Sequence, residues 1–106
     1  MSEKQKLLIV DDSELNRDIL KEILGSRYDY MEAENGTQAI QILEVHPEID
    51  LMLLDINMPQ MNGFQVLEHM RELQWIDEVP VVMISSEESV EIMRKAYDLG
   101  ITDYIS

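Results

Sequence analysis

Three short apolar runs, each followed by acidic or hydroxyl side chains, dominate the pattern of hydrophobic and polar positions. The runs are Leu7–Val10, Leu51–Leu54 and Val81–Ile84. Runs of this length without alternation are typical of parallel strands that are buried on both faces. Tyr28–Ala33 and Ile101–Ile105 have a weaker apolar pattern, and we interpret them as a second and a fifth strand of the same sheet.

Between these strands, apolar residues recur at helical spacing. Leu15, Ile19 and Ile23 follow i, i+4, i+8 spacing, which predicts a helix that Ser13 or Asp12 caps. Three more helices are predicted: from Asn35-Gly36 to just before Pro47, from Asn62-Gly63 through Leu73, and over Glu87–Leu99 with Val90, Met93 and Ala96 facing inward.

Strands and helices therefore alternate along the chain. Strict alternation predicts right-handed βαβ units and a parallel sheet with helices on both faces. In such a sheet, functional residues collect beyond the carboxyl ends of the strands. Asp11, Asp12, Asp55 and Ser85 each follow or end a predicted strand, so we expect these side chains to lie close together.

Composition narrows the function classes. A chain of 106 residues suggests one domain over residues 1–106, and its 45% hydrophobic content is enough for one core. Its 22 acidic and 8 basic residues argue against nucleic-acid binding. There is no cysteine, and His46 and His69 lie on predicted helices, so a zinc site is not expected. Without an apolar run long enough to cross a membrane, we expect a cytoplasmic protein.

The acidic residues at the strand ends suggest a divalent cation. Converging carboxylates repel one another, and Mg²⁺ relieves the repulsion with oxygen ligands and water. Asp12 and Asp55 are the expected direct ligands, Asp11 is expected to act through water, and the backbone carbonyl of Asn57 can supply another oxygen. A solvated acidic surface that binds no ion is the plainer alternative.

A carboxylate beside Mg²⁺ can also attack phosphorus and form an aspartyl phosphate. We expect Asp55 to be that nucleophile and Ser85 to supply a nearby hydroxyl group. Taken singly, Asp11-Asp12 could be a helix cap, Asp55 a turn residue and Ser85 part of an ordinary loop. Their positions at the ends of three predicted neighbouring strands favour the functional interpretation.

These residues belong to a recognisable set of motifs. The chain resembles the receiver domain of two-component response regulators over nearly its whole length. The resemblance rests on Leu-Leu-Ile-Val-Asp-Asp-Ser (7–13), Glu-Ala-Glu-Asn-Gly (32–36), Leu-Leu-Asp-Ile-Asn-Met-Pro-Gln-Met-Asn-Gly (53–63), Pro-Val-Val-Met-Ile-Ser-Ser (80–86) and Gly-Ile-Thr-Asp-Tyr-Ile (100–105).

The resemblance implies a flavodoxin-like, doubly wound five-stranded sheet of order 2-1-3-4-5. It also implies that Asp55 accepts a phosphoryl group from a sensor histidine kinase or phosphotransfer protein, with Asp11 and Asp12 as the acidic metal pair. Ser85 matches the switch hydroxyl and Tyr104 the aromatic switch residue. Phosphorylation would then be relayed to the surface of the fourth helix and fifth strand, where a downstream output domain or protein binds.

Two positions are expected to tune the lifetime of the phosphorylated state. Asn57 and Glu87 lie two residues beyond Asp55 and Ser85, where both can border the path of an attacking water.

The sequence departs from the family pattern near its last residue. The pattern continues with a Lys one position beyond Ser106, and then with a fifth helix. We therefore expect a truncated chain whose phosphorylation or switching is impaired because one neutralising cation is absent. The surface left by the missing helix is expected to promote self-association. Ser86 stands where the family usually has Ala. Ser still fits beside the phosphoryl site, so we expect access to be kept.

The same residues are compatible with two other function classes. A pseudo-receiver would bind partners without being phosphorylated, which the intact acidic residues argue against. A phosphatase of the haloacid dehalogenase type also uses an aspartyl phosphate, but it needs a second Asp two residues after the nucleophile, where this chain has Asn57. We therefore expect a switch that is not an enzyme, apart from its own phosphotransfer and dephosphorylation.

Overall fold

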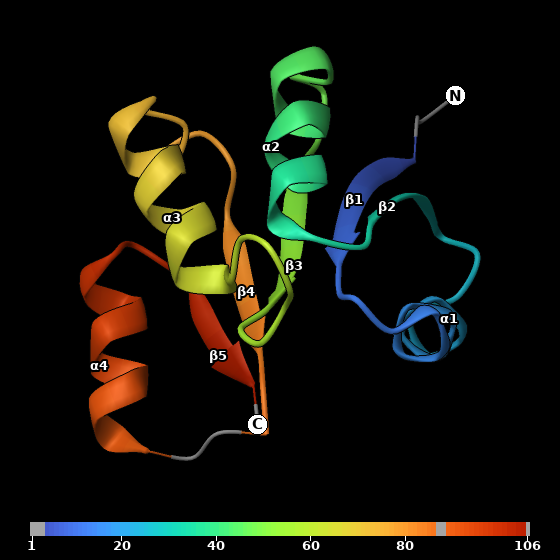
Figure 1. The fold of residues 1–106 in the computed structure, drawn as a ribbon. Helices are drawn as coiled ribbons and strands as arrows, with labels where there is room; N and C mark the ends of the chain where they lie inside the picture. The colour runs from blue at the N-terminus through green and yellow to red at the C-terminus, as the bar shows by residue number, and fades with distance from the viewer. Residues whose placement is uncertain (1–3, 87–88, 106) are drawn as a thin grey trace.

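The computed structural model describes residues 4–86 and 89–105, which form a parallel sheet and the helices that pack on it (Figure 1). The strand order is β2-β1-β3-β4-β5, as predicted. The strands are β1 (Gln5–Val10), β2 (Tyr28–Ala33), β3 (Leu51–Asp55), β4 (Val81–Ile84) and β5 (Asp103–Ile105).

The helices follow the strands in alternation, which confirms the predicted βαβ pattern. They are α1 (Glu14–Leu24), α2 (Gly36–Val45), α3 (Gly63–Glu72) and α4 (Val90–Asp98). Polar side chains begin the first three: Ser13, Asn35 and Asn62 each accept a hydrogen bond from a backbone N–H of the first turn. These caps place the helix N-termini beside the carboxyl ends of the strands.

The last two elements differ in detail from the sequence prediction. β5 begins at Asp103, because the N–H of Ile101 still bonds to the carbonyl of Ala96 at the end of α4. Val90, expected to face inward, is 68% exposed, so that prediction was wrong. Val90 is the first residue of α4, and it is Ala96 that reaches the core.

The main core lies on one face of the sheet, beneath α2, α3 and α4. Alternate strand residues such as Leu8, Met52 and Met83 are fully buried there. The intervening residues, among them Ile9 and Leu53, are buried on the opposite face, which carries α1. The two faces therefore differ in how many helices cover them, and Figure 1 shows α1 apart from the other three helices.

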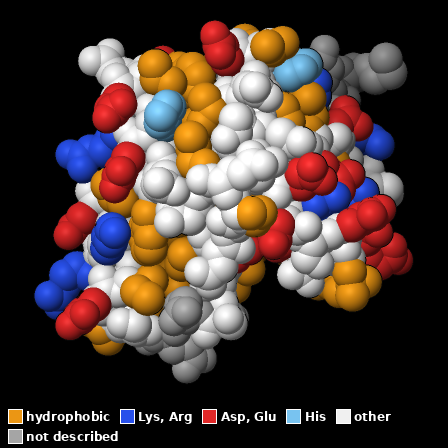
Figure 2. Space-filling model, in the orientation of Figure 1, with side chains coloured by type: hydrophobic (Ala, Val, Ile, Leu, Met, Phe, Trp, Pro, Cys, Tyr) orange, Lys and Arg blue, Asp and Glu red, His pale blue; other side chains and the backbone are white. Residues whose placement is uncertain are grey.

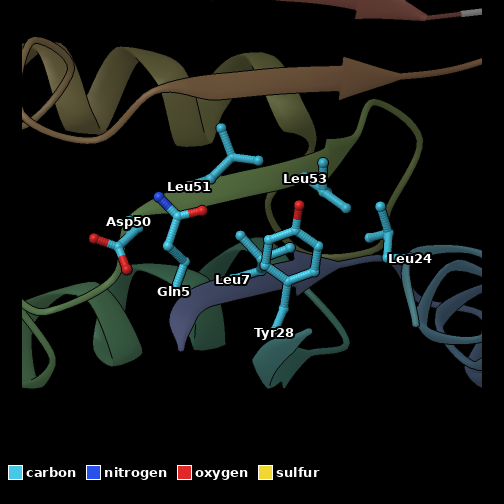
Figure 3. A pocket seen from close by; sticks show the side chains of 7 residues that line it. All are labelled: Gln5, Leu7, Leu24, Tyr28, Asp50, Leu51 and Leu53. Carbon is cyan, nitrogen blue, oxygen red and sulfur yellow. The ribbon is translucent and has the colours of Figure 1, made fainter. Parts of the chain in front are cut away.

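α1 leaves its apolar stripe in solvent. Leu15, Ile19 and Ile23 are 68%, 46% and 73% exposed, and no residue of this helix is buried. A cavity of about 220 Å³ lies beside it on the sheet, where Leu24 of α1 approaches Tyr28 and the leucines of β1 and β3 (Figure 3). Among the described residues, no helix is both long and apolar enough to span a membrane.

Candidate functional site

Three carboxylates converge at the carboxyl ends of β1 and β3. Asp11 and Asp12 follow β1, and Asp55 is the last residue of β3. The two strands are neighbours, and Val10 pairs with Leu54, so Asp11 lies level with Asp55. One carboxylate oxygen from each of the three residues lies within 4.8 Å of the others. The structure therefore brings together the acidic residues that the sequence singled out.

Burial and charge make Asp55 unusual. Burial raises the pKa of its carboxyl group to about 6, and the negative charges of Asp11 and Asp12 add to the increase. Backbone N–H groups of Asn57 and Ile56 donate to this carboxylate and partly oppose the shift. Burial is the largest cause, so the protonated form of Asp55 is favoured relative to an exposed aspartate.

Asp11 is buried and held from several sides. Its Oδ1 accepts from the N–H of Ser13 at 2.9 Å, and its Oδ2 accepts from the side-chain amide of Asn16 at 3.5 Å. Its own N–H donates to the carbonyl of Ala33 in β2 at 3.1 Å. Burial still raises the pKa of Asp11, with Asp12 adding to the increase. Asp12, in contrast, is exposed, so the pair combines one fixed and one accessible carboxylate.

Two residues that the sequence reasoning missed also hold this turn. Arg17, one turn into α1, donates from Nη1 to the carbonyl of Asp11 at 2.7 Å and from Nε to Glu32 of β2 at 2.9 Å. Glu32 opens the motif at 32–36, but no sequence pattern pairs it with Arg17. Only the spatial pairing of α1 with β2 shows that they meet.

The candidate switch residues lie in the next strands of the sheet. Ser85 directly follows β4, is 6% exposed, and donates its N–H to the carbonyl of Ile105 at 3.0 Å. Tyr104 on β5 is 8% exposed and lies opposite Met83. The ring of Tyr104 is thus already inside the core. Both residues therefore lie on the strands that precede and follow α4 in the chain.

The loop from β3 to α3 packs tightly against the backbone of Asp55. The N–H of Gly63 donates to the carbonyl of Ile56 at 2.9 Å, and a Cβ at Gly63 would lie 2.5 Å from the carbonyl oxygen of Asp55. A Cβ at Gly36 would collide with the backbone and side chain of Met61 in the same loop. Both glycines are needed because the backbone passes too close for a side chain.

The donor set suits a hard divalent cation. Mg²⁺ binds carboxylate and carbonyl oxygens, and one carboxylate oxygen each of Asp11, Asp12 and Asp55 lies within 4.8 Å of the others. The backbone of Asn57 adjoins the Asp55 carboxylate through its N–H, and the role of its carbonyl as a ligand stays a prediction. Glu87, predicted to tune the phosphoryl lifetime, lies outside the described residues.

Comparison with known proteins assigns the family. The family model described as "Response regulator receiver domain" matches residues 7–106. The chain is 36% identical over 102 residues to chemotaxis protein CheY1 of Helicobacter pylori. That match covers 94% of this chain and 82% of the relative. It is 31% identical over 100 residues to the two-component response regulator ORR3 of Oryza sativa subsp. indica, covering 93% of this chain and 76% of the relative. The chain belongs to the response-regulator receiver family.

Solved structures agree on the fold. A CheX-CheY-BeF3-Mg+2 complex from Borrelia burgdorferi superposes with a TM-score of 0.87 at 30% identity, covering 95% of this chain and 76% of that chain. The phosphorylated cyanobacterial phytochrome response regulator RcpA gives a TM-score of 0.88 at 25% identity, covering 98% and 81%. The flavodoxin-like fold and membership of the two-component system are thus shown.

One relative is matched over only a small part of its length. The chain is 34% identical over 99 residues to a probable cyclic di-GMP phosphodiesterase of Vibrio cholerae, but it matches only 22% of that protein. Receiver domains act as signalling switches joined to diverse partners, and the match to this enzyme covers only a small part of it. It therefore gives no reason to expect phosphodiesterase activity here.

Proposed function

We propose that Asp55 accepts a phosphoryl group from the phosphohistidine of a sensor histidine kinase or phosphotransfer protein, and that this chain is the resulting signalling switch. The observation that supports the proposal most strongly is the convergence of three carboxylates within 4.8 Å at the ends of β1 and β3. Such a cluster suits a divalent cation, and burial together with the charges of Asp11 and Asp12 raises the pKa of Asp55, its member at the end of β3, to about 6.

The chemistry needs positioning and neutralisation of charge more than it needs acid–base groups. A carboxylate oxygen of Asp55 forms the new bond to phosphorus, and the phosphorus–nitrogen bond of the phosphohistidine breaks. The electron pair leaves with the imidazole nitrogen, which takes up a proton. Below pH 6 a growing share of Asp55 is protonated in the metal-free protein, and the protonated carboxyl group is a poor nucleophile.

In this proposal Asp11, Asp12, Asp55 and the carbonyl of Asn57 hold a Mg²⁺ ion. When bound, Mg²⁺ supplies positive charge that stabilises the phosphoryl oxygens and suppresses repulsion among the carboxylates. Asp11 is fixed by the hydrogen bonds from Ser13 and Asn16, so it orients the site. Asp12 is exposed, so it is the carboxylate that incoming ions and phosphodonors meet first.

The signal is proposed to travel through Ser85 and Tyr104 to the α4-β5 face. Phosphorylation adds strong acceptor oxygens beside Asp55, and the Ser85 hydroxyl moves to donate to one of them. Tyr104 of β5 and Ala96 of α4 belong to the same buried cluster. A movement of the Tyr104 ring would therefore displace both β5 and α4. These two elements are already linked, since the Tyr97 hydroxyl donates to Asp103 at 3.2 Å. A downstream output domain or protein would read this face.

Three narrower expectations from the sequence belong to the same proposal. A cytoplasmic location is expected because two-component phosphotransfer uses cytoplasmic phosphodonors. Direct contact with nucleic acid is not expected, because the net charge is −14. Self-association through the α1 side stays a prediction, and its basis is the exposed stripe of Leu15, Ile19 and Ile23.

The proposal is tested with a small-molecule phosphodonor. The protein is incubated with acetyl phosphate and Mg²⁺ and its intact mass is measured. We expect a single phosphoryl adduct that is lost in Asp55→Asn and when EDTA removes the ion. An Asp29→Asn variant, which removes an exposed carboxylate on β2, is the matched control and should keep the adduct. Absence of any adduct would favour a receiver that binds partners without phosphorylation.

A further inference from the structure

We propose that Arg17 and Glu32 form a clamp that positions the Asp11-Asp12 turn for the divalent cation, so that Arg17 is a positioning residue of the metal site. This inference rests on the proposed function, because it assigns residues of α1 and β2 to the same site. It starts from the hydrogen bonds of one guanidinium group.

Arg17 joins three elements at a single point. Its Nη1 donates to the carbonyl of Asp11 at 2.7 Å, and its Nε donates to Oε1 of Glu32 at 2.9 Å. Its side chain is 12% exposed, although α1 is otherwise an exposed helix. The guanidinium therefore connects α1, the end of β1 and the strand β2 with a fixed geometry that only a planar, forked donor can satisfy.

Glu32 is itself held in place. Its second oxygen, Oε2, accepts from Nζ of Lys21 at 2.9 Å, so the carboxylate lies between two cations of α1. These cations lower the pKa of Glu32, with the Lys21 hydrogen bond as the larger cause. Figure 2 shows basic and acidic side chains side by side on the right of the view, where α1 and β2 lie. Glu32 is thus an ionised, oriented acceptor for Arg17.

The clamp acts on the backbone of Asp11 more than on its charge. The Asp11 N–H donates to the carbonyl of Ala33, which directly follows Glu32 in β2, while the Asp11 carbonyl accepts from Arg17. The N–H of Asp11 is therefore held by the neighbour of Glu32, and its carbonyl by the side chain that also bonds Glu32. Arg17 bonds the backbone carbonyl of Asp11, whereas the Asp11 carboxylate accepts from Ser13 and Asn16. Arg17 therefore acts on the position of the turn, while its Nε bonds the carboxylate of Glu32.

A fixed backbone at Asp11 matters because Mg²⁺ demands near-ideal octahedral geometry. Groups that orient metal ligands through hydrogen bonds typically contribute about 10- to 100-fold to metal affinity. Without the clamp, the turn that carries Asp11 and Asp12 keeps its carboxylates but loses one of the bonds that hold its peptide plane. We therefore expect the affinity for Mg²⁺ to fall by roughly tenfold while the fold persists.

The test compares Mg²⁺ binding by calorimetry in four variants of the full chain. Arg17→Met removes both bonds, and Arg17→Lys keeps the charge but cannot bond both acceptors in the same way. Glu32→Gln removes the ionised acceptor. Arg71→Met is the matched control, because Arg71 is an exposed arginine in the last turn of α3 and takes no part in the clamp. Urea unfolding and circular dichroism report whether each variant is folded, and the backbone amide shifts of Asp11 and Asp12 report the turn directly.

We expect Arg17→Met and Arg17→Lys to bind Mg²⁺ about tenfold more weakly, and Arg71→Met to stay within about twofold of the parent. Parental affinity in Arg17→Lys together with weak binding in Arg17→Met would overturn the positional role in favour of charge alone. Parental affinity in all Arg17 variants would overturn the clamp while leaving the proposed function intact. If Arg17→Met does not fold, Arg17→Lys and Glu32→Gln decide. A parent that binds no Mg²⁺ would overturn the metal site and the clamp together.

Discussion

The carboxylates of Asp11 and Asp55 lie within 4.8 Å of each other at the ends of two adjacent strands, and the charge of Asp11 helps to raise the pKa of Asp55 to about 6. Burial is the larger cause of this shift. In the unfolded chain the same group has an ordinary pKa near 3.8. Folding therefore favours the protonated form of Asp55, and ionisation of Asp55 opposes folding.

This relationship gives a prediction for Asp55→Asn without metal. Above pH 6 the folded parent carries an unfavourable charge that the variant lacks. The shift corresponds to at most about 3 kcal/mol, and because Asp55 is partly exposed we expect Asp55→Asn to be more stable at pH 7.5 by about half of that. The difference should shrink as pH falls through 6 and vanish below the unfolded-state value near 3.8.

Urea unfolding of parent and variant at pH 7.5, 5 and 3.5 measures this difference. Adding Mg²⁺ at pH 7.5 should stabilise the parent and close the gap, because the ion binds the folded state. Asp29→Asn controls for the loss of one negative charge at a distant exposed position. Equal stability of parent and Asp55→Asn at pH 7.5 would contradict the electrostatic account.

Gly36 supports the loop that follows the acceptor. We expect Gly36→Ala to destabilise the protein by about 1–3 kcal/mol, because the new methyl group would collide with Met61. It should also slow phosphorylation by acetyl phosphate, since Met61 belongs to the β3–α3 loop. Gly25→Ala is the control: a Cβ there meets nothing within 4 Å, so its cost comes only from the backbone conformation at φ 81°. Gly25→Ala should leave the phosphorylation rate unchanged.

The relay predicts different results for two adjacent serines. In Ser85→Ala, Asp55 should still be phosphorylated, but the amide shifts of Tyr97 and Asp103 should change much less on phosphorylation than in the parent. Ser86 is exposed, so Ser86→Ala should behave as the parent does. If Ser85→Ala transmits the full change to α4 and β5, the switch role of Ser85 is wrong.

The exposed stripe of α1 predicts concentration-dependent self-association. Sedimentation velocity of the parent should show dimers that increase with salt, because salt screens the net charge of −14. Ile19→Glu should abolish them. Val45→Glu places the same charge at a more exposed apolar residue of α2 and should not abolish them. A parent that stays monomeric at all concentrations and salt levels would remove this expectation.

Much of the fold could be predicted because the apolar pattern and its interruptions are local. The run Tyr28–Ala33 matches β2 at both ends, and the polar residues after Val10 and Leu54 mark real strand ends. The convergence of Asp11 and Asp55 followed from the rule that parallel strands share a carboxyl edge. These are consequences of sequence order and spacing.

Other features depend on tertiary contacts that spacing does not encode. Helical spacing placed Val90 inward, yet α4 touches the core mainly through Ala96 and leaves Val90 in solvent. The roles of Arg17 and Glu32 arise only because α1 lies against β2 in space. Glu32 stands in the motif at 32–36, but the spacing of neither residue encodes the pairing of its carboxylate with Arg17.

Chemical trapping of the acyl phosphate tests directly whether Asp55 is the phospho-acceptor. The protein is phosphorylated with acetyl phosphate and Mg²⁺ and then reduced with borohydride, which converts an aspartyl phosphate to homoserine. Peptide mass spectrometry then locates the converted residue. We expect homoserine at position 55 and at no other aspartate. Conversion at Asp11 or Asp12 with Asp55 intact would show that another aspartate is the acceptor.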